Sequence, residues 1–223
     1  MGFIDQLVAL FESNANPEFA SGMKAYMRNK FEFYGVKSQL RRELVKKTVV
    51  LHKDYVAENT RTIALELYQL PYRELHHCGM EIFEKELRKT YKKEDIKFIE
   101  QLISINSWWD TVDYIAKNIL GKYLLMYPEE INAIISKFTR SDDLWLNRST
   151  IIFQLGYKTK TNEDILFEQC MTFRHSKEFF IQKAIGWSLR EYGKTNPENV
   201  LKFVNSTQLK PLSRKEAIRN ILK

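Results

Sequence analysis

The sequence has few cysteines, glycines and prolines, and it has no long apolar run. Its 223 residues include 2 cysteines, 8 glycines and 5 prolines. Cys78 and Cys170 lie far apart and form no Cys-x-x-Cys pair, so we expect no disulfide framework and a reducing, cytoplasmic environment. No apolar stretch is long enough to cross a bilayer, and the N-terminus lacks the basic-then-apolar pattern of a signal peptide. We therefore expect a cytoplasmic protein with no membrane partner.

Histidine is also scarce. The four histidines show no ligand spacing with one another or with the cysteines; they are His52, His76, His77 and His175. We therefore expect no metal site, and no motif indicates a cofactor.

Apolar and basic residues are well represented. Hydrophobic residues make up 44% of the chain and aromatic residues 13%, which is typical of a folded globular protein with a sizeable core. Lysine and arginine number 35 against 28 aspartates and glutamates, a formal net charge of +7. This excess favours a polyanionic partner: a nucleic acid, or alternatively an acidic peptide bound by a helical scaffold.

Apolar residues recur at helical spacing, and strand-like alternation is hard to find, so the sequence predicts an all-α chain. Residues that commonly begin helices occur at regular intervals. These are Asn16-Pro17, Ser38, Ser107, Pro128, Ser141, Asn162, Ser176, Asn196-Pro197 and Ser213. The segment Ser213-Arg214-Lys215-Glu216 reads as a capping box.

The regular spacing reflects an internal repeat. The segment that begins at Asp143 aligns with the one that begins 35 residues later at Glu178, so that Arg148 aligns with Lys183. One further step back places Asp113 in the same position. A period of this length is typical of two-helix solenoid units. We therefore expect residues 1–223 to form a single domain, a superhelical solenoid of stacked antiparallel HEAT-like helix pairs, with these three charged residues on one surface.

The stretch Ser107-Trp108-Trp109-Asp110-Thr111-Val112-Asp113 combines two tryptophans with two carboxylates. Ser107 and Asp110 have the spacing of an N-terminal capping pair, which predicts a helix start. Trp109 and Asp113 are four residues apart and would share a face, with Asp113 as an unpaired carboxylate beside an indole. Such a carboxylate suits the stabilisation of positive charge. The alternative is that both tryptophans are core residues and Asp113 is a solvated edge residue.

Aromatic and basic residues surround this row. Trp187 follows Lys183 by four residues, and further cations are Lys158, Lys160, Lys177, Arg190 and Lys194. Basic residues interleaved with aromatics on a concave wall suit a nucleic-acid backbone. We assign Trp145 and Phe179-Phe180 to the core.

Several ordered segments across nearly the whole chain resemble the AlkD-type alkylpurine DNA glycosylases. They are Ser107–Asp113, Trp145–Arg148, Ser176–Trp187, Leu189–Tyr192, Lys194–Pro197 and Pro211–Arg214. The resemblance implies a HEAT-like monomer, without metal or cofactor, that binds duplex DNA containing alkylated purines. It implies hydrolysis of the N-glycosidic bond of positively charged N3- and N7-alkylpurines, such as 7-methylguanine and 3-methyladenine, in base excision repair. No lysine is placed as a Schiff-base nucleophile, so base release without strand cleavage is expected.

The resemblance also implies roles for individual residues. Asp113 would be the catalytic carboxylate, with Trp109 and Trp187 as its aromatic walls, and the DNA contacts would include Arg148, Tyr26, Lys183, Arg190 and Lys194. The sequence departs from the family pattern at Lys37-Ser38, where the family has glutamine and threonine, and at Gly156, where it has lysine. Lys37 can meet a phosphate and Gly156 cannot. A catalytically weak or inactive relative that recognises DNA shape is the alternative function.

Overall fold

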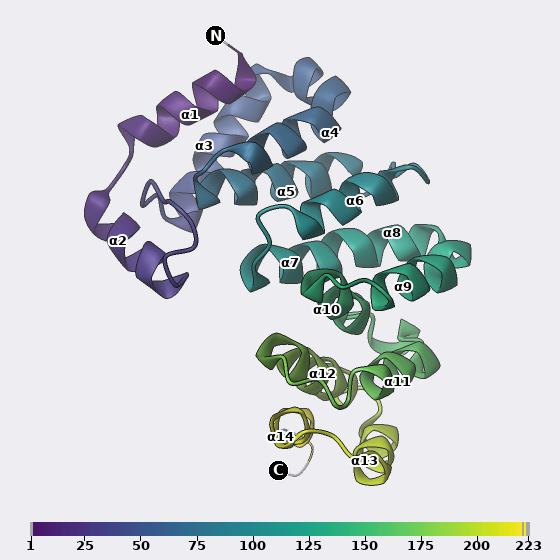
Figure 1. Ribbon diagram of the computed structural model, residues 1–223. Coiled ribbons are helices and arrows are strands. Elements are labelled where there is room, and N and C mark those ends of the chain that lie inside the picture. The colour runs from purple at the N-terminus through teal and green to yellow at the C-terminus, as the bar shows by residue number, and fades with distance from the viewer. Residues whose placement is uncertain (1, 220, 222–223) are drawn as a thin grey trace. The chain divides into compact units, whose positions relative to one another are not determined.

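The computed structural model describes residues 2–219 and 221, and helices dominate them (Figure 1). Within these residues there is no β-strand, only an isolated bridge between Glu32 and Tyr72. The all-α prediction is therefore confirmed. The α-helices are α1 (Phe3–Ser13), α2 (Pro17–Tyr26), α3 (Ser38–Leu51), α4 (Lys53–Gln69), α5 (Arg73–Leu87), α6 (Asp95–Ser104), α7 (Trp109–Ile115), α8 (Gly121–Met126), α9 (Ile131–Thr139), α10 (Leu144–Ile152), α11 (Glu163–Thr172), α12 (Phe179–Tyr192), α13 (Pro197–Ser206) and α14 (Pro211–Ile218).

Packing divides the chain into two compact units, Met1–Phe98 and Ile99–Lys223, with the boundary inside α6. A single domain over residues 1–223 therefore stays a prediction. Within residues 2–219 and 221, no helix combines the length and apolar character that crossing a membrane requires.

The first unit packs α1, α3, α4 and α5 around one apolar cluster that includes Phe3, Leu7 and Phe11. The helix α2 contributes no buried residue to it. Asn16 caps α2 as predicted, because its side chain accepts a hydrogen bond from the Phe19 amide at 3.0 Å. The turn that follows α2 is held by the buried Glu74, whose carboxylate accepts hydrogen bonds from the amides of residues 34–36.

The second unit shows the predicted period. The helices α7, α10 and α12 begin at Trp109, Leu144 and Phe179, which are 35 residues apart. In Figure 1, α10, α12 and α14 follow one another beside α9, α11 and α13. The helix α12 packs on both α10 and α14, and α10, α12 and α14 pack on α9, α11 and α13, respectively. Their shared core includes Ile151, Leu166 and Ile185. Each repeat buries its apolar face against the next one, as expected for stacked helix pairs.

Four predicted helix starts are wrong, at Ser107, Ser141, Ser176 and Ser213. The N-cap residues of α10 and α12 are Asp143 and Glu178, each two residues after the predicted serine. The N-cap of α7 is Trp108, in extended conformation, and the Ser107 hydroxyl instead donates to the Ile103 carbonyl at 2.6 Å. The helix α14 begins at Pro211, so Ser213 lies in its first turn, where its buried hydroxyl donates to the Gln182 carbonyl of α12 at 3.0 Å. Both hydroxyls satisfy a carbonyl of another element instead of capping their own helix.

Candidate functional site

Asp113 lies on α7, three residues before a π-helical segment, η1 (Ala116–Leu120), that continues into α8. The chain passes very close to α10 here: a Cβ at Gly121 would lie 2.5 Å from the carbonyl oxygen of Phe153, so only glycine fits without a shift. The Tyr157 hydroxyl donates to the Gly121 carbonyl at the point where the π-helical segment interrupts the α-helix and passes into α8. Interruptions of this kind are frequent at functional sites.

The carboxylate of Asp113 forms a two-point ion pair with Arg148 of α10. Arg148 Nε donates to Oδ1 at 2.7 Å, and Nη2 donates to Oδ2 at 2.8 Å. The remaining terminal nitrogen, Nη1, donates to the Phe180 carbonyl at the start of α12. One guanidinium therefore joins three successive repeats, and this geometry is the strong, bidentate form of a charge-assisted hydrogen bond.

Both members of the pair are largely removed from solvent. The side chain of Arg148 is 5% exposed and that of Asp113 is 18% exposed. Burial raises the pKa of Asp113 above its ordinary value of 3.8, whereas the hydrogen bonds and charge of Arg148 lower it and the nearby Asp110 raises it slightly further. The prediction that Asp113 is unpaired is therefore wrong: it is a buried acid with its own counter-charge.

The two tryptophans that were predicted to flank the carboxylate are both half-buried. Trp109 opens α7, one helical turn before Asp113. Trp187 lies on α12 and packs against the core cluster of the second unit. Because α10 packs against both α7 and α12, the two indoles come from the helices on either side of Arg148. The alternative interpretation, in which Trp108 and Trp109 are both core residues, therefore holds for the buried Trp108 but not for Trp109.

Another aromatic cluster lies against the ion pair. The rings of Trp108, Trp145 and Phe180 contact one another with centroid separations of 5.5, 5.1 and 5.1 Å, and the Phe180 centroid lies 6.0 Å from Arg148 Cζ. Trp108 is buried, and Trp145 and Phe180 are partly buried. The core assignment is wrong for Phe179, whose side chain is 53% exposed. The cluster limits solvent access to the guanidinium.

The predicted cations of α12 and its C-terminal end already have acidic partners. Lys183 Nζ lies 2.9 Å from Glu216 Oε1, and Arg190 Nη1 pairs with Glu216 Oε2. Lys194 Nζ lies 2.6 Å from Glu191 Oε2. Hydrogen bonding by Lys183 is the main cause that lowers the pKa of Glu216. Glu216 was predicted to belong to a capping box, and its spacing of 33 residues from Lys183, about one repeat, is the signal in the sequence that could have indicated this pairing.

The remaining residues singled out from the sequence lie elsewhere. Tyr26, in the first unit, is 70% exposed. Lys37 Nζ lies 3.8 Å from the centroid of the Phe19 ring, a cation–π contact on an exposed surface. Gly156 has a φ of 89°, a backbone conformation that a lysine would adopt here only with strain. Across the described residues, no three His, Cys, Asp or Glu side chains gather as a possible metal site.

These features define an all-helical repeat protein with a largely buried, arginine-paired carboxylate and with aromatic residues on the helices that carry the ion pair. The model of the DNA alkylation repair enzyme family matches residues 7–221, and the chain belongs to this family. DNA is thus its substrate, and its role lies in the repair of alkylated DNA.

Solved structures agree. A predicted DNA alkylation repair enzyme from Enterococcus faecalis is 31% identical and superposes with a TM-score of 0.86, over 94% of this chain and 97% of that one. The smu.31 protein of Streptococcus mutans UA159 is 17% identical with a TM-score of 0.58, over 82% of this chain and 98% of that one, a likeness in fold alone. The comparison with curated proteins finds no match.

Proposed function

We propose that this protein is a monofunctional DNA glycosylase that hydrolyses the N-glycosidic bond of positively charged N3- and N7-alkylpurines in duplex DNA. The observation that carries this proposal is the buried Asp113 carboxylate, which Arg148 holds in a fixed orientation. A carboxylate so placed can stabilise a cation that develops beside it, because burial strengthens electrostatic interactions.

The chemistry of the substrate fits a single carboxylate. An N7- or N3-alkylated purine is positively charged and is already a competent leaving group, so no general acid is required. As the bond breaks, positive charge moves to the deoxyribose, as in glycoside hydrolysis generally. Asp113 would stabilise that charge and orient the attacking water. Trp109 and Trp187 would add cation–π attraction of about 0.5–2 kcal/mol each.

Arg148 would act first as a positioning residue. Each carboxylate oxygen of Asp113 accepts one hydrogen bond from it and retains a second lone pair that can accept from water. The positive charge of Arg148 also opposes the effect of burial on the pKa of Asp113 and so favours the ionised form. The guanidinium uses three of its five N–H donors on Asp113 and Phe180, and we propose that the others reach the DNA backbone.

The DNA backbone would be bound by cations and aromatics on both units. Lys183 and Lys194 retain exposed side chains, 39% and 60% accessible, despite their acidic partners. Arg190 is less accessible, at 20%. A phosphate can share or replace Glu216 and Glu191 as the partner of these cations. Tyr26 is well exposed for a contact from the first unit.

The test is incubation of the purified protein with methylated duplex DNA, followed by chromatography of the released bases. We expect 7-methylguanine and 3-methyladenine to be released and the strand to stay intact until alkali is added. If excess protein releases neither base while it still binds the duplex, the glycosylase proposal fails and a DNA-shape reader remains.

A further inference from the structure

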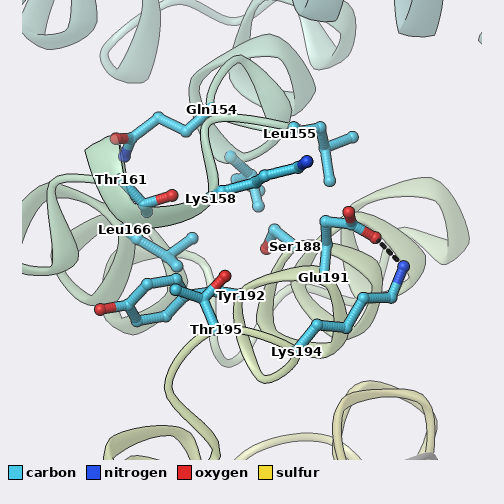
Figure 2. Close-up of a pocket in the computed structure, with 12 residues that line it drawn as sticks. Gln154, Leu155, Lys158, Thr161, Leu166, Ser188, Glu191, Tyr192, Lys194 and Thr195 are labelled. Atoms are coloured by element: carbon cyan, nitrogen blue, oxygen red, sulfur yellow. Dashed lines mark hydrogen bonds and ion pairs between the residues drawn. The ribbon is translucent and has the colours of Figure 1, made fainter.

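The second unit contains a cavity of about 200 Å³ between the C-terminal ends of α10 and α12 (Figure 2). Its apolar wall is formed by Ile151, Leu155 and Leu166. On α12 it is lined by Ser188, Glu191 and Tyr192, which are spaced by three and four residues and share a helix face. Asp113, Arg148, Lys183, Trp187 and Arg190 do not line the cavity, so it is distinct from the Asp113 site, although Lys194 belongs both to the cavity and to the proposed DNA contacts.

Two lysines stand at the cavity, one from each of two successive repeats. Lys194 is paired with Glu191 at 2.6 Å, as the dashed line in Figure 2 shows. Lys158 extends across the cavity toward the side on which Lys194 lies. Its side chain is exposed and makes no ion pair with any residue that the structure describes. The cavity therefore carries one uncompensated positive charge.

The backbone that presents Lys158 is unusual. Lys158 has a φ of 55° and Gly156 one of 89°, so two residues of this short turn adopt the left-handed conformation. Residues other than glycine rarely adopt this backbone conformation, and those that do are often found at binding sites. Between them Tyr157 is fixed, because its hydroxyl donates to the Gly121 carbonyl of the preceding repeat. The turn is thus anchored while its lysine extends across the cavity.

Two threonine hydroxyls complete the polar lining. The sequence Lys-Thr-Asn occurs twice, at residues 160–162 and 194–196, and each asparagine caps the helix that follows, α11 or α13. Thr161 and Thr195 from these two segments line the cavity. Neither side-chain hydroxyl is hydrogen-bonded to any described residue, so both are available as donors.

We propose that this cavity binds a phosphate group. Lys158 and Lys194 would supply positive charge, Thr161 and Thr195 would donate hydrogen bonds, and the sugar or other apolar part of the ligand would lie against Leu155 and Leu166. A phosphate monoester would compete with Glu191 for Lys194 because it carries more charge and more acceptor oxygens than a carboxylate. A backbone phosphodiester of bound DNA offers the same phosphoryl oxygens with a single negative charge; only this second source rests on the proposed function.

The test is an NMR titration of the full chain that follows the backbone amides of Thr161 and Thr195. The probes are inorganic phosphate, a nucleoside 5′-monophosphate and an unmodified DNA duplex. Each titration is compared with a reference in which the same buffer, free of sulfate and phosphate, is added without the probe. Both amides should shift with at least one probe at millimolar concentration. K158Q and K194Q should each weaken that binding about fivefold. K160Q is the matched control, because Lys160 is exposed and near in sequence but does not line the cavity. The affinity of the K160Q variant for the probe should change less than about twofold.

Shifts with the mononucleotide alone identify a free ligand, and shifts with the duplex alone identify the DNA backbone; either result supports the proposal. The proposal is overturned if no probe shifts the two amides, or if K160Q weakens binding as much as K158Q. Phosphate binding by a protein that releases no base would overturn only the glycosylase proposal. Base release without phosphate binding at this cavity would overturn only the present one.

Discussion

Asp113→Asn tests the Asp113 site most directly, because it alters charge and hydrogen bonding but hardly alters shape. The amide oxygen of the asparagine can still accept one hydrogen bond from Arg148. Its amide nitrogen, however, would face a guanidinium N–H, donor against donor, where the second carboxylate oxygen now accepts at 2.8 Å. Arg148 would then be a buried cation without a counter-charge, since its side chain is only 5% exposed.

The expected magnitude follows from this geometry. Removing one partner of a buried ion pair costs about 3–5 kcal/mol, and the retained hydrogen bond together with the partial exposure of Asp113 places the loss near about 3 kcal/mol. A domain with about 5–15 kcal/mol of stability would remain folded. Loss of the carboxylate beside a developing cation should reduce base release about 100- to 1,000-fold.

The two effects are separated by two measurements on one preparation. Urea denaturation gives the free energy of unfolding, and single-turnover release of 7-methylguanine, below the unfolding transition, gives the rate. Asp110→Asn is the control, because Asp110 lies on the same helix but is not the partner of Arg148. The reasoning is refuted if Asp113→Asn releases base within about threefold of the unaltered protein, or if Asp110→Asn loses as much.

Three further expectations concern the same unit. Because burial raises the pKa of Asp113 and the ionised form is needed, base release should fall on acidification with a midpoint above pH 3.8, and Asp110→Asn should shift that midpoint downward; a pH–rate profile measures both. Glu216→Gln should destabilise the protein by about 2 kcal/mol near neutral pH, where the ion pairs to Lys183 and Arg190 exist. Pairing lowers the pKa of Glu216, so the carboxyl becomes protonated only below this lowered pKa. In urea titrations below that pH, the difference in stability between Glu216→Gln and the unaltered protein should vanish. A difference that persists there would contradict the pairing. Gly186→Ala should cost about 1–3 kcal/mol in thermal or urea unfolding, because the new Cβ would lie 2.4 Å from Glu216 Cβ; an unchanged stability would show that α12 and α14 separate easily.

The helical repeat could be predicted from the sequence because stacking imposes it. Every repeat must present an apolar face to its neighbours, so the pattern of apolar residues indicates the spacing of the helices. The helices α10 and α12 begin 35 residues apart, as predicted. Asparagine caps were also predictable, as at Asn16, Asn162 and Asn196, because the interaction is local.

Serine was a less reliable signal because its hydroxyl donates as readily as it accepts. Ser107 and Ser213 both donate to a carbonyl of another helix, and the tertiary contact decides whether such a hydroxyl donates or caps its own helix.

The pairing of charges could not be predicted from the sequence for a similar reason. The repeat placed Asp113, Arg148 and Lys183 in equivalent positions, yet only the packing of the helices shows which neighbours meet and that Lys183 turns to Glu216.

The pairing of Asp113 with Arg148 has a consequence for the kind of substrate that this site favours. Without a counter-charge the pKa of this carboxylate would be raised further by burial, and the protonated acid cannot stabilise a cation. A fully neutralised pair would attract a cation only weakly. The observed geometry lies between these limits: Arg148 lies to one side of Asp113, the other side is not closed by an ion pair among the described residues, and 18% of the side chain stays accessible. Such a carboxylate acts at short range on a charge brought into contact with it. If the proposed function holds, a charge that moves from the purine to a sugar in contact with Asp113 would be stabilised more in the transition state than in the ground state, which is the condition for catalysis.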